Sequence, residues 1–252
     1  MKCSILLAMA LGVMVIGCKK AQEESKNGSG ICRLKSVSED AVSSGTTFEY
    51  GPDGKIIRET YEDGSYATFT VESGQLVVRS YTSTGQLKPD YEKKIHTLNS
   101  QGYIGKTVDI HPGDTDTYIY TYSPEGHKIK EEVFDYKGKW ESTSNYTVVD
   151  GNRVMKDYIS SHDNDTSTEV YSFLQAENTA GIGMYPFGHD GLEQYYGKVN
   201  KNLVNTVAIS YGSTSLSFYY EMDGDRVKYL AISQPGFPNT MKFWYTYENC
   251  KK

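Results

Sequence analysis

The chain is poor in the residues that mark several common protein classes. It has 252 residues but only 4 cysteines and 7 prolines, and 38% of the sequence is hydrophobic. So few cysteines exclude a disulfide-dense scaffold, and the hydrophobic content excludes a polytopic membrane protein. Positive charge is also scarce, because 26 lysines and arginines stand against 32 aspartates and glutamates. The formal net charge of -6 argues against a basic nucleic-acid binder, so we expect no nucleic acid among its partners.

Tyrosine and glycine are abundant instead. The sequence contains 22 tyrosines and 24 glycines, and 13% of its residues are aromatic. Disordered chains are poor in aromatic residues, so this composition predicts a folded chain. The length suits one large domain or two modest ones.

The first 17 residues have the composition of a secretory leader. Lys2 supplies a short positive region, and residues 4–16 are almost wholly apolar. A membrane-spanning helix needs about 20 apolar residues, so this run is too short to stay as an anchor. Its length is typical of the apolar part of a signal peptide.

The end of this leader resembles a lipobox, the recognition site of the bacterial lipoprotein signal peptidase. The matching residues are Val15, Ile16, Gly17 and Cys18, followed by a polar stretch. The resemblance implies a signal peptide over residues 1–17 and a diacylglycerol-modified Cys18 that holds the mature chain on the lipid bilayer. Each buried lipid CH₂ contributes about 0.8 kcal/mol, and stable attachment takes more than one acyl chain. An ordinary secretory signal with an incidental cysteine is the alternative.

Residues 18–30 are interpreted as the lipidated cysteine and a flexible tether, because they lack apolar periodicity and are rich in Lys, Glu, Ser and Gly. Residues 31–252 are interpreted as a single all-β domain. Apolar and polar residues alternate there with a period of two, and turn residues interrupt the pattern. Glycines at positions 54, 64, 74 and 85 recur at nearly even intervals, and hairpin turns favour glycine because they require a positive φ. The pattern predicts an antiparallel meander of repeated hairpins that curls into a sandwich or an open barrel.

Two known protein types resemble this body. Units of Tyr-x-Tyr followed by a glycine turn resemble the YD repeat of Rhs-type shells. The same units, the leader, and the runs at residues 97–104 and 197–203 resemble a family of uncharacterised lipoproteins from Gram-negative gut bacteria. The second resemblance implies an antiparallel β fold and a cell-envelope location, most naturally the outer membrane, and it implies no activity.

Residues 176–205 depart from the hairpin pattern. Asp190 and Glu193 fit a capping box for a single helical turn that Gly197 stops. Such a turn would gather four aromatic rings, which could form a ligand platform: Tyr185, Phe187, Tyr195 and Tyr196. The alternative, which we prefer, is that this loop plugs one end of the sheet and that the rings belong to the core.

Cys32 and Cys250 are the two thiols that remain after lipidation. They stand at opposite ends of the predicted domain, so a disulfide would join its termini if the first and last strands are neighbours. A cell-envelope location permits such a bond. Two unpaired thiols are the alternative.

The sequence contains no recognisable catalytic constellation. The 5 histidines lack zinc-site spacing, no Gly-x-Ser-x-Gly motif is present, and no cofactor is expected. We therefore expect a non-catalytic envelope protein that binds a glycan, peptide or protein. Two alternatives remain: a structural or assembly scaffold of the envelope, and a hydrolase whose paired carboxylates are dispersed in the sequence.

Overall fold

The computed structural model describes residues 33–39, 45–88, 93–111, 114–162, 165–178, 192–210, 214–237 and 240–250. Within them the chain forms strands and one 3-10 turn, η1 (Glu193–Tyr195). The strands are β1 (Arg33–Ser38), β2 (Thr46–Tyr50), β3 (Ile56–Thr60), β4 (Tyr66–Glu72), β5 (Gln75–Tyr81), β6 (Lys93–Leu98), β7 (Ile104–His111), β8 (Asp114–Tyr122), β9 (Lys128–Phe134), β10 (Trp140–Val149), β11 (Asn152–Ser160), β12 (Thr166–Glu177), β13 (Asn202–Ile209), β14 (Thr214–Asp223), β15 (Arg226–Ser233) and β16 (Met241–Glu248). No helix in this part of the chain is long and apolar enough to cross a membrane.

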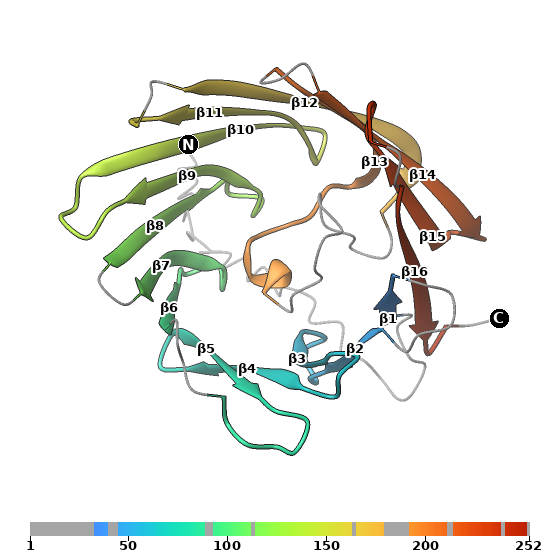
Figure 1. Cartoon of the computed structure of the whole chain (residues 1–252), viewed down its shortest axis with the longest axis horizontal. Helices are drawn as coiled ribbons and strands as arrows, with labels where there is room; N and C mark the ends of the chain where they lie inside the picture. Colours follow the sequence, from blue (N-terminus) through green and yellow to red (C-terminus); the bar gives the residue numbers. More distant parts are fainter. Residues whose placement is uncertain are drawn as a thin grey trace, which may run out of the picture.

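The strands form one closed antiparallel barrel (Figure 1). Each strand pairs with the next along the chain, and β1 pairs with β16 to complete the ring, with Arg33 opposite Glu248. The predicted all-β meander is therefore confirmed. The meander closes fully instead of forming a sandwich or an open barrel, because the pairing of β1 with β16 removes the two free sheet edges. Every strand of the ring lies within residues 33–250, so residues 19–252 contain the complete barrel.

The predicted turns at glycines 54, 64, 74 and 85 are confirmed. Gly74 lies in a two-residue turn between Glu72 and Gln75, and the other three share one geometry with three further turns. In each of six turns, the first residue donates its N–H to the carbonyl of the fifth, and a glycine at the fourth position donates to the carbonyl of the first. These glycines have φ between +74° and +94°. This is the pattern of a type I turn followed by a left-handed residue. The six turns are residues 51–55, 61–65, 82–86, 99–103, 123–127 and 135–139.

A repeated tyrosine contact joins neighbouring strands and accounts for part of the tyrosine content. In four places a tyrosine hydroxyl donates to a backbone carbonyl of the preceding strand at 2.6–2.8 Å. Each ring lies against the sheet while its hydroxyl finds a polar partner, which suits a half-buried aromatic residue. The four pairs are Tyr50 with Leu34, Tyr122 with Ile104, Tyr220 with Val204, and Tyr247 with Val227.

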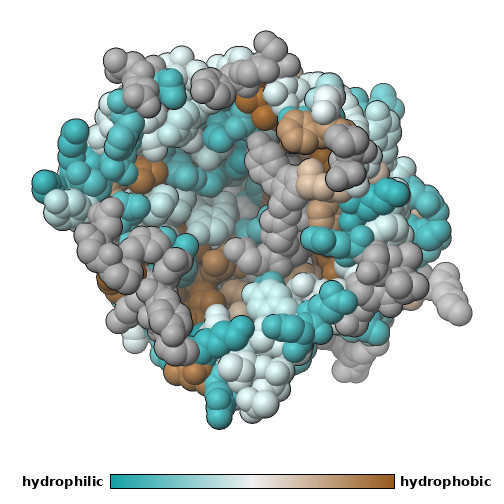
Figure 2. All heavy atoms as spheres, viewed as in Figure 1, coloured by the Kyte–Doolittle hydropathy of each residue, from teal (hydrophilic) through white to brown (hydrophobic). Residues whose placement is uncertain are grey.

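The barrel interior is most apolar along one side. The larger apolar cluster lines β1, β2 and β12–β16, and includes Phe48, Val207 and Leu230. A smaller apolar cluster lies on β4, β5 and β7 and includes Tyr195 of η1, and buried polar side chains on β3, β6, β7 and β10 include Glu59 and His96. Figure 2 shows the molecule hollowed at the centre of the view, with hydrophilic residues along one side of the hollow and hydrophobic residues along another.

Candidate functional site

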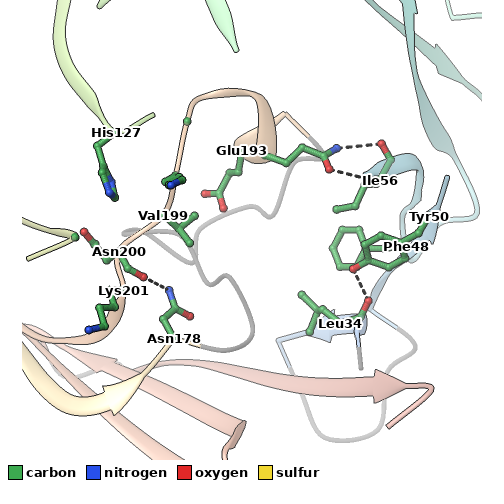
Figure 3. Close-up of a pocket in the computed structure, with 14 residues that line it drawn as sticks. Leu34, Phe48, Tyr50, Ile56, His127, Asn178, Glu193, Val199, Asn200 and Lys201 are labelled. Carbon is green, nitrogen blue, oxygen red and sulfur yellow. Dashed lines mark hydrogen bonds between the residues drawn. The ribbon is translucent and has the colours of Figure 1, made fainter. Parts of the chain in front are cut away.

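A pocket of about 640 Å³ lies at one end of the barrel (Figure 3). One side is formed by β1, β2 and the start of β3. The other is formed by residues 193–201 and by the turns that contain His127 and Gly151. We call residues 192–201 the inner segment, because η1 lies inside the ring of strands (Figure 1). The end of the barrel that carries the pocket is called the pocket end.

The inner segment is fixed to the barrel wall at both of its ends. The side-chain amide of Gln194 accepts from the Ile56 N–H at 2.8 Å and donates to the Ile56 carbonyl at 3.0 Å. Further along, Lys198 donates its N–H to the Gly126 carbonyl at 2.8 Å, and Lys201 donates to the Gly151 carbonyl at 3.0 Å. The pocket is the space that these attachments leave between the inner segment and β1–β3.

Gly197 allows the inner segment to approach the wall closely. Its φ is +97°, and a Cβ at this position would lie 2.7 Å from the carbonyl oxygen of Gly126. Only glycine meets both conditions without strain. The predicted stop at Gly197 is thus confirmed.

The predicted capping box depends on Asp190, which lies outside the described residues, so it stays a prediction. Within the described part, η1 follows Leu192, which has helical φ and ψ.

The wall formed by β1–β3 is apolar. Leu34 and Phe48 are 7% and 5% exposed, and Tyr50 and Ile56 pack against the same cluster. The Tyr50 hydroxyl donates to the Leu34 carbonyl at 2.6 Å. Burial raises the pKa of Tyr50 to about 12, so its hydroxyl stays protonated at neutral pH. This wall offers a ligand an apolar contact surface without charged groups.

The opposite wall is polar and is held by asparagines. The Asn200 side chain accepts from the Arg153 N–H at 2.7 Å, and the Asn178 side chain donates to the Asn200 carbonyl at 3.2 Å. His127, Lys198 and Lys201 complete this wall. Burial, and then the charge of Lys198, lower the pKa of His127, so that imidazole is neutral at neutral pH.

Glu193 is the single carboxylate among the described residues that line the pocket. The hydrolase alternative requires two carboxylates about 5–9.5 Å apart. The described lining does not supply such a pair in this pocket.

A cluster of cations and tyrosines adjoins the polar wall. The Lys128 ammonium lies 2.8 Å from a Glu131 carboxylate oxygen and within 5.1–5.4 Å of three tyrosine ring centroids. The rings belong to Tyr120, Tyr146 and Tyr196. Burial lowers the pKa of Lys128, and the Glu131 charge opposes that effect. Arg153 lies 4.1 Å from the centroid of the Tyr146 ring, a cation–π distance.

Two of the four rings predicted as a ligand platform are described, and both are packed. Tyr195 is 2% exposed within a core cluster, and the Lys55 ammonium lies 4.6 Å from its ring centroid. Tyr196 meets Tyr120 edge to face, with centroids 5.3 Å apart. These contacts favour the alternative in which the loop plugs the barrel. Tyr185 and Phe187 lie outside the described residues.

The two other predicted sites are partly visible. Cys250 is disulfide-bonded, and the pairing of Arg33 with Glu248 makes the first and last strands neighbours, as the predicted bond requires. Cys32 and Cys18 lie outside the described residues, so the Cys32–Cys250 pairing and the lipidation stay predictions. No group of three or more metal-binding side chains gathers in the described part of the chain.

The comparisons with known proteins concern the fold. No family model and no curated protein matches the sequence. The structure is similar to that of a porin-like protein from Bacteroides uniformis, with a TM-score of 0.61 and 16% identity over 86% of this chain and 95% of that one. A porin-like protein from Bacteroides vulgatus matches with a TM-score of 0.54 and 12% identity over 86% of this chain and 99% of that one.

A third match, to a structure described as TcdB2-TccC3-TEV, has a TM-score of 0.34 and 13% identity over 79% of this chain and 12% of that one. No argument rests on it. The two Bacteroides structures share the expected β-rich fold, and at their low identity they show nothing more. The resemblance to uncharacterised lipoproteins stays a prediction.

Proposed function

We propose that this protein is a non-catalytic binding protein of the bacterial cell envelope, which takes a glycan, a peptide or a segment of a partner protein into the pocket. The observation that carries the proposal is the pocket itself. Its volume of about 640 Å³ falls within the range of about 300–1,000 Å³ typical of ligand sites. It also combines an apolar wall with a few placed polar groups, which is the usual composition of such sites.

Two observations support the envelope location. The leader and lipobox of residues 1–18 favour an outer-membrane lipoprotein held through Cys18. Two solved structures with a similar fold are described as porin-like proteins from Bacteroides.

The outer wall of the barrel favours binding over pore formation. Ion pairs join neighbouring strands there, such as Arg79 with Glu72 at 3.1 Å and Arg58 with Glu49 at 3.6 Å. Lipid-facing barrel walls carry an apolar band, where charged side chains are destabilising. A water-facing barrel on a lipid tether fits this wall better than a spanning barrel does.

The start of β1 lies at the pocket end of the barrel. Arg33 starts β1 and lies opposite Glu248 at the end of β16. In an antiparallel meander successive connections alternate between the two ends, which puts this pair at the pocket end with the turns 123–127 and 150–151. A lipid anchor upstream of Arg33 would therefore join the barrel on the side where a ligand enters.

A binding screen with a blocked variant tests the proposal. Residues 19–252 are screened on glycan and peptide arrays, and each hit is repeated with Val199→Trp, which fills the pocket. Val170→Trp, at an outward position that is 51% exposed, is the matched control. We expect hits that Val199→Trp abolishes and Val170→Trp retains. A folded protein that binds nothing, or hits that survive Val199→Trp, would contradict the proposal.

A further inference from the structure

The polar side of the pocket holds cations that form no ion pair with a carboxylate of the described residues. Lys198 and Lys201 line the pocket. Arg153 lines a small adjoining cavity of about 30 Å³, which shares His127, Lys198 and Asn200 with the pocket. None of these three cations forms an ion pair within 4 Å with a described residue, in contrast to the neighbouring Lys128, which is paired with Glu131.

The charge of this pocket wall is positive, whereas the net charge of the whole chain is negative. The protein carries a formal net charge of -6, yet the described lining of the two cavities contains one carboxylate, Glu193. The charge of Lys198 acts on the pocket wall, because it lowers the pKa of His127. A cationic pocket wall in an acidic protein is complementary to an anionic group.

The apolar side lies across the pocket from these cations. Figure 3 shows Ile56, Tyr50, Phe48 and Leu34 on one side, and His127, Asn200 and Lys201 on the other. A ligand that crosses the pocket meets a surface without charge at one end and a cationic surface at the other. Burial of an apolar tail against the uncharged side is favourable, and a charge-assisted contact fixes the head of the ligand.

We propose that the ligand is a single-chain amphiphile with an anionic head, its chain against Leu34, Phe48 and Ile56 and its head toward Lys198, Lys201 and Arg153. The head is a carboxylate or a phosphate, both of which suit this cation set. The inference rests on the proposal that this pocket binds a ligand, and it names a ligand class other than the glycans and peptides of the array screen. A lipid anchor on residue 18 would hold the pocket end near a bilayer, and a bilayer is a source of such amphiphiles.

The test compares head groups on one chain length. Isothermal titration calorimetry of residues 19–252 is performed with decanoate, decyl phosphate and decyltrimethylammonium, each below its micelle concentration. The variant is Lys198→Glu with Lys201→Glu. Its matched control is Lys35→Glu with Lys242→Glu, two exposed lysines outside the pocket lining that change the net charge equally. Thermal denaturation confirms that both double variants fold.

We expect at least one anionic amphiphile to bind one to one, and the cationic amphiphile to bind at least tenfold more weakly. The Lys198→Glu, Lys201→Glu variant should bind the anionic amphiphile at least tenfold more weakly, and the control variant should change the Kd for this amphiphile less than twofold. The ratio between decanoate and decyl phosphate identifies the head group. Equal binding of the anionic and cationic amphiphiles, or an equal effect of the two double variants, would overturn the inference.

The array screen distinguishes failure of the proposed ligand class from failure of the proposed binding function. Array hits that Val199→Trp abolishes, together with no amphiphile binding, would overturn the ligand class and leave the binding function standing. Silence in both experiments would overturn both.

Discussion

Gln194 and Ile56, which are 138 residues apart, form a two-point hydrogen-bonded pair inside the barrel. The Gln194 side-chain amide accepts from the Ile56 N–H at 2.8 Å and donates to the Ile56 carbonyl at 3.0 Å. The side chain thus pairs with the strand backbone as a neighbouring strand would. This contact fixes the distance between the inner segment and the apolar wall, and hence the width of the pocket.

Gln194→Ala removes this pair and leaves two partly buried backbone groups without their partner. Loss of the partner of one fully buried group costs about 1–3 kcal/mol, and a partly buried group loses less. We expect the free energy of unfolding, measured by urea denaturation, to fall by about 1–3 kcal/mol and ligand affinity to fall with it. Gln175→Ala, at an exposed position on β12, is the control and should change stability by less than about 0.5 kcal/mol. Equal stability of the two variants would show that the pair does not hold the inner segment.

The contribution of the tyrosine-to-carbonyl hydrogen bonds to stability can be tested by comparing two adjacent tyrosines. Tyr220→Phe deletes the hydroxyl that donates to the Val204 carbonyl at 2.8 Å and keeps the ring. We expect a loss of about 0.5–1.5 kcal/mol in chemical denaturation. Tyr219→Phe, at a position that is 60% exposed, should be nearly neutral. If both variants unfold at the same denaturant concentration, the hydroxyl contacts do not stabilise the barrel.

Substitutions at Gly74 test the effect of backbone conformation on stability without a change in packing. Gly74 has φ +78°, and a Cβ there would meet nothing within 4 Å. Gly74→Ala should therefore cost about 1–2 kcal/mol through backbone strain alone. Asparagine tolerates the left-handed region better, so Gly74→Asn should cost less. Thermal unfolding of both variants ranks them, and a Gly74→Asn variant that is no more stable than Gly74→Ala would refute the backbone explanation.

His96 makes stability depend on pH. It is 1% exposed and shares a 2.9 Å hydrogen bond with the Thr107 hydroxyl. Burial, and then the charge of Lys94, lower the pKa of His96 to about 4, and the Asp109 charge opposes them. The unfolded chain binds a proton near pH 6.5, before the folded protein does, so protonation favours unfolding as the pH falls from about 6.5 to 4.

The slope over that range should reach about 1.4 kcal/mol per pH unit from this group alone. Denaturant unfolding between pH 4.5 and 7.5 measures it for the unsubstituted protein and for His96→Gln. We expect His96→Gln to flatten the profile, even if it lowers stability at pH 7. Parallel profiles for the two proteins would assign the pH dependence to other groups.

The local features of the fold follow from the sequence. Glycines 54, 64, 74 and 85 were predicted in turns, and each has a positive φ, because a hairpin turn is decided by the few residues that form it. The strands were predictable because successive side chains of a strand point to opposite faces of the sheet, so that apolar and polar residues alternate. Phe243 and Tyr245 are buried while the intervening Trp244 is half-buried.

Closure and the pocket depend on contacts between distant residues. Ser36 meets Thr246 across 210 positions, and no local pattern distinguishes this pairing from a sandwich or an open barrel. The pocket gathers Leu34, His127 and Gln194 from separate turns and strands. Two sequence signals pointed to this region. Residues 176–205 depart from the hairpin pattern, and within them lies the run at 197–203, whose first five residues line the pocket. Alternation also cannot show which inward positions are polar, so His96 and Glu169 were not expected inside the barrel.

The most direct test of ligand binding in this barrel is a nuclear magnetic resonance titration of ¹⁵N-labelled residues 19–252 with decanoate and decyl phosphate. We expect saturable amide shifts that cluster at Leu34, Phe48, Ile56 and residues 197–201, while outer-wall amides such as Arg79 stay unchanged. Shifts confined to the outer wall, or none at saturating amphiphile, would contradict the assignment of this pocket as the binding site for an anionic amphiphile.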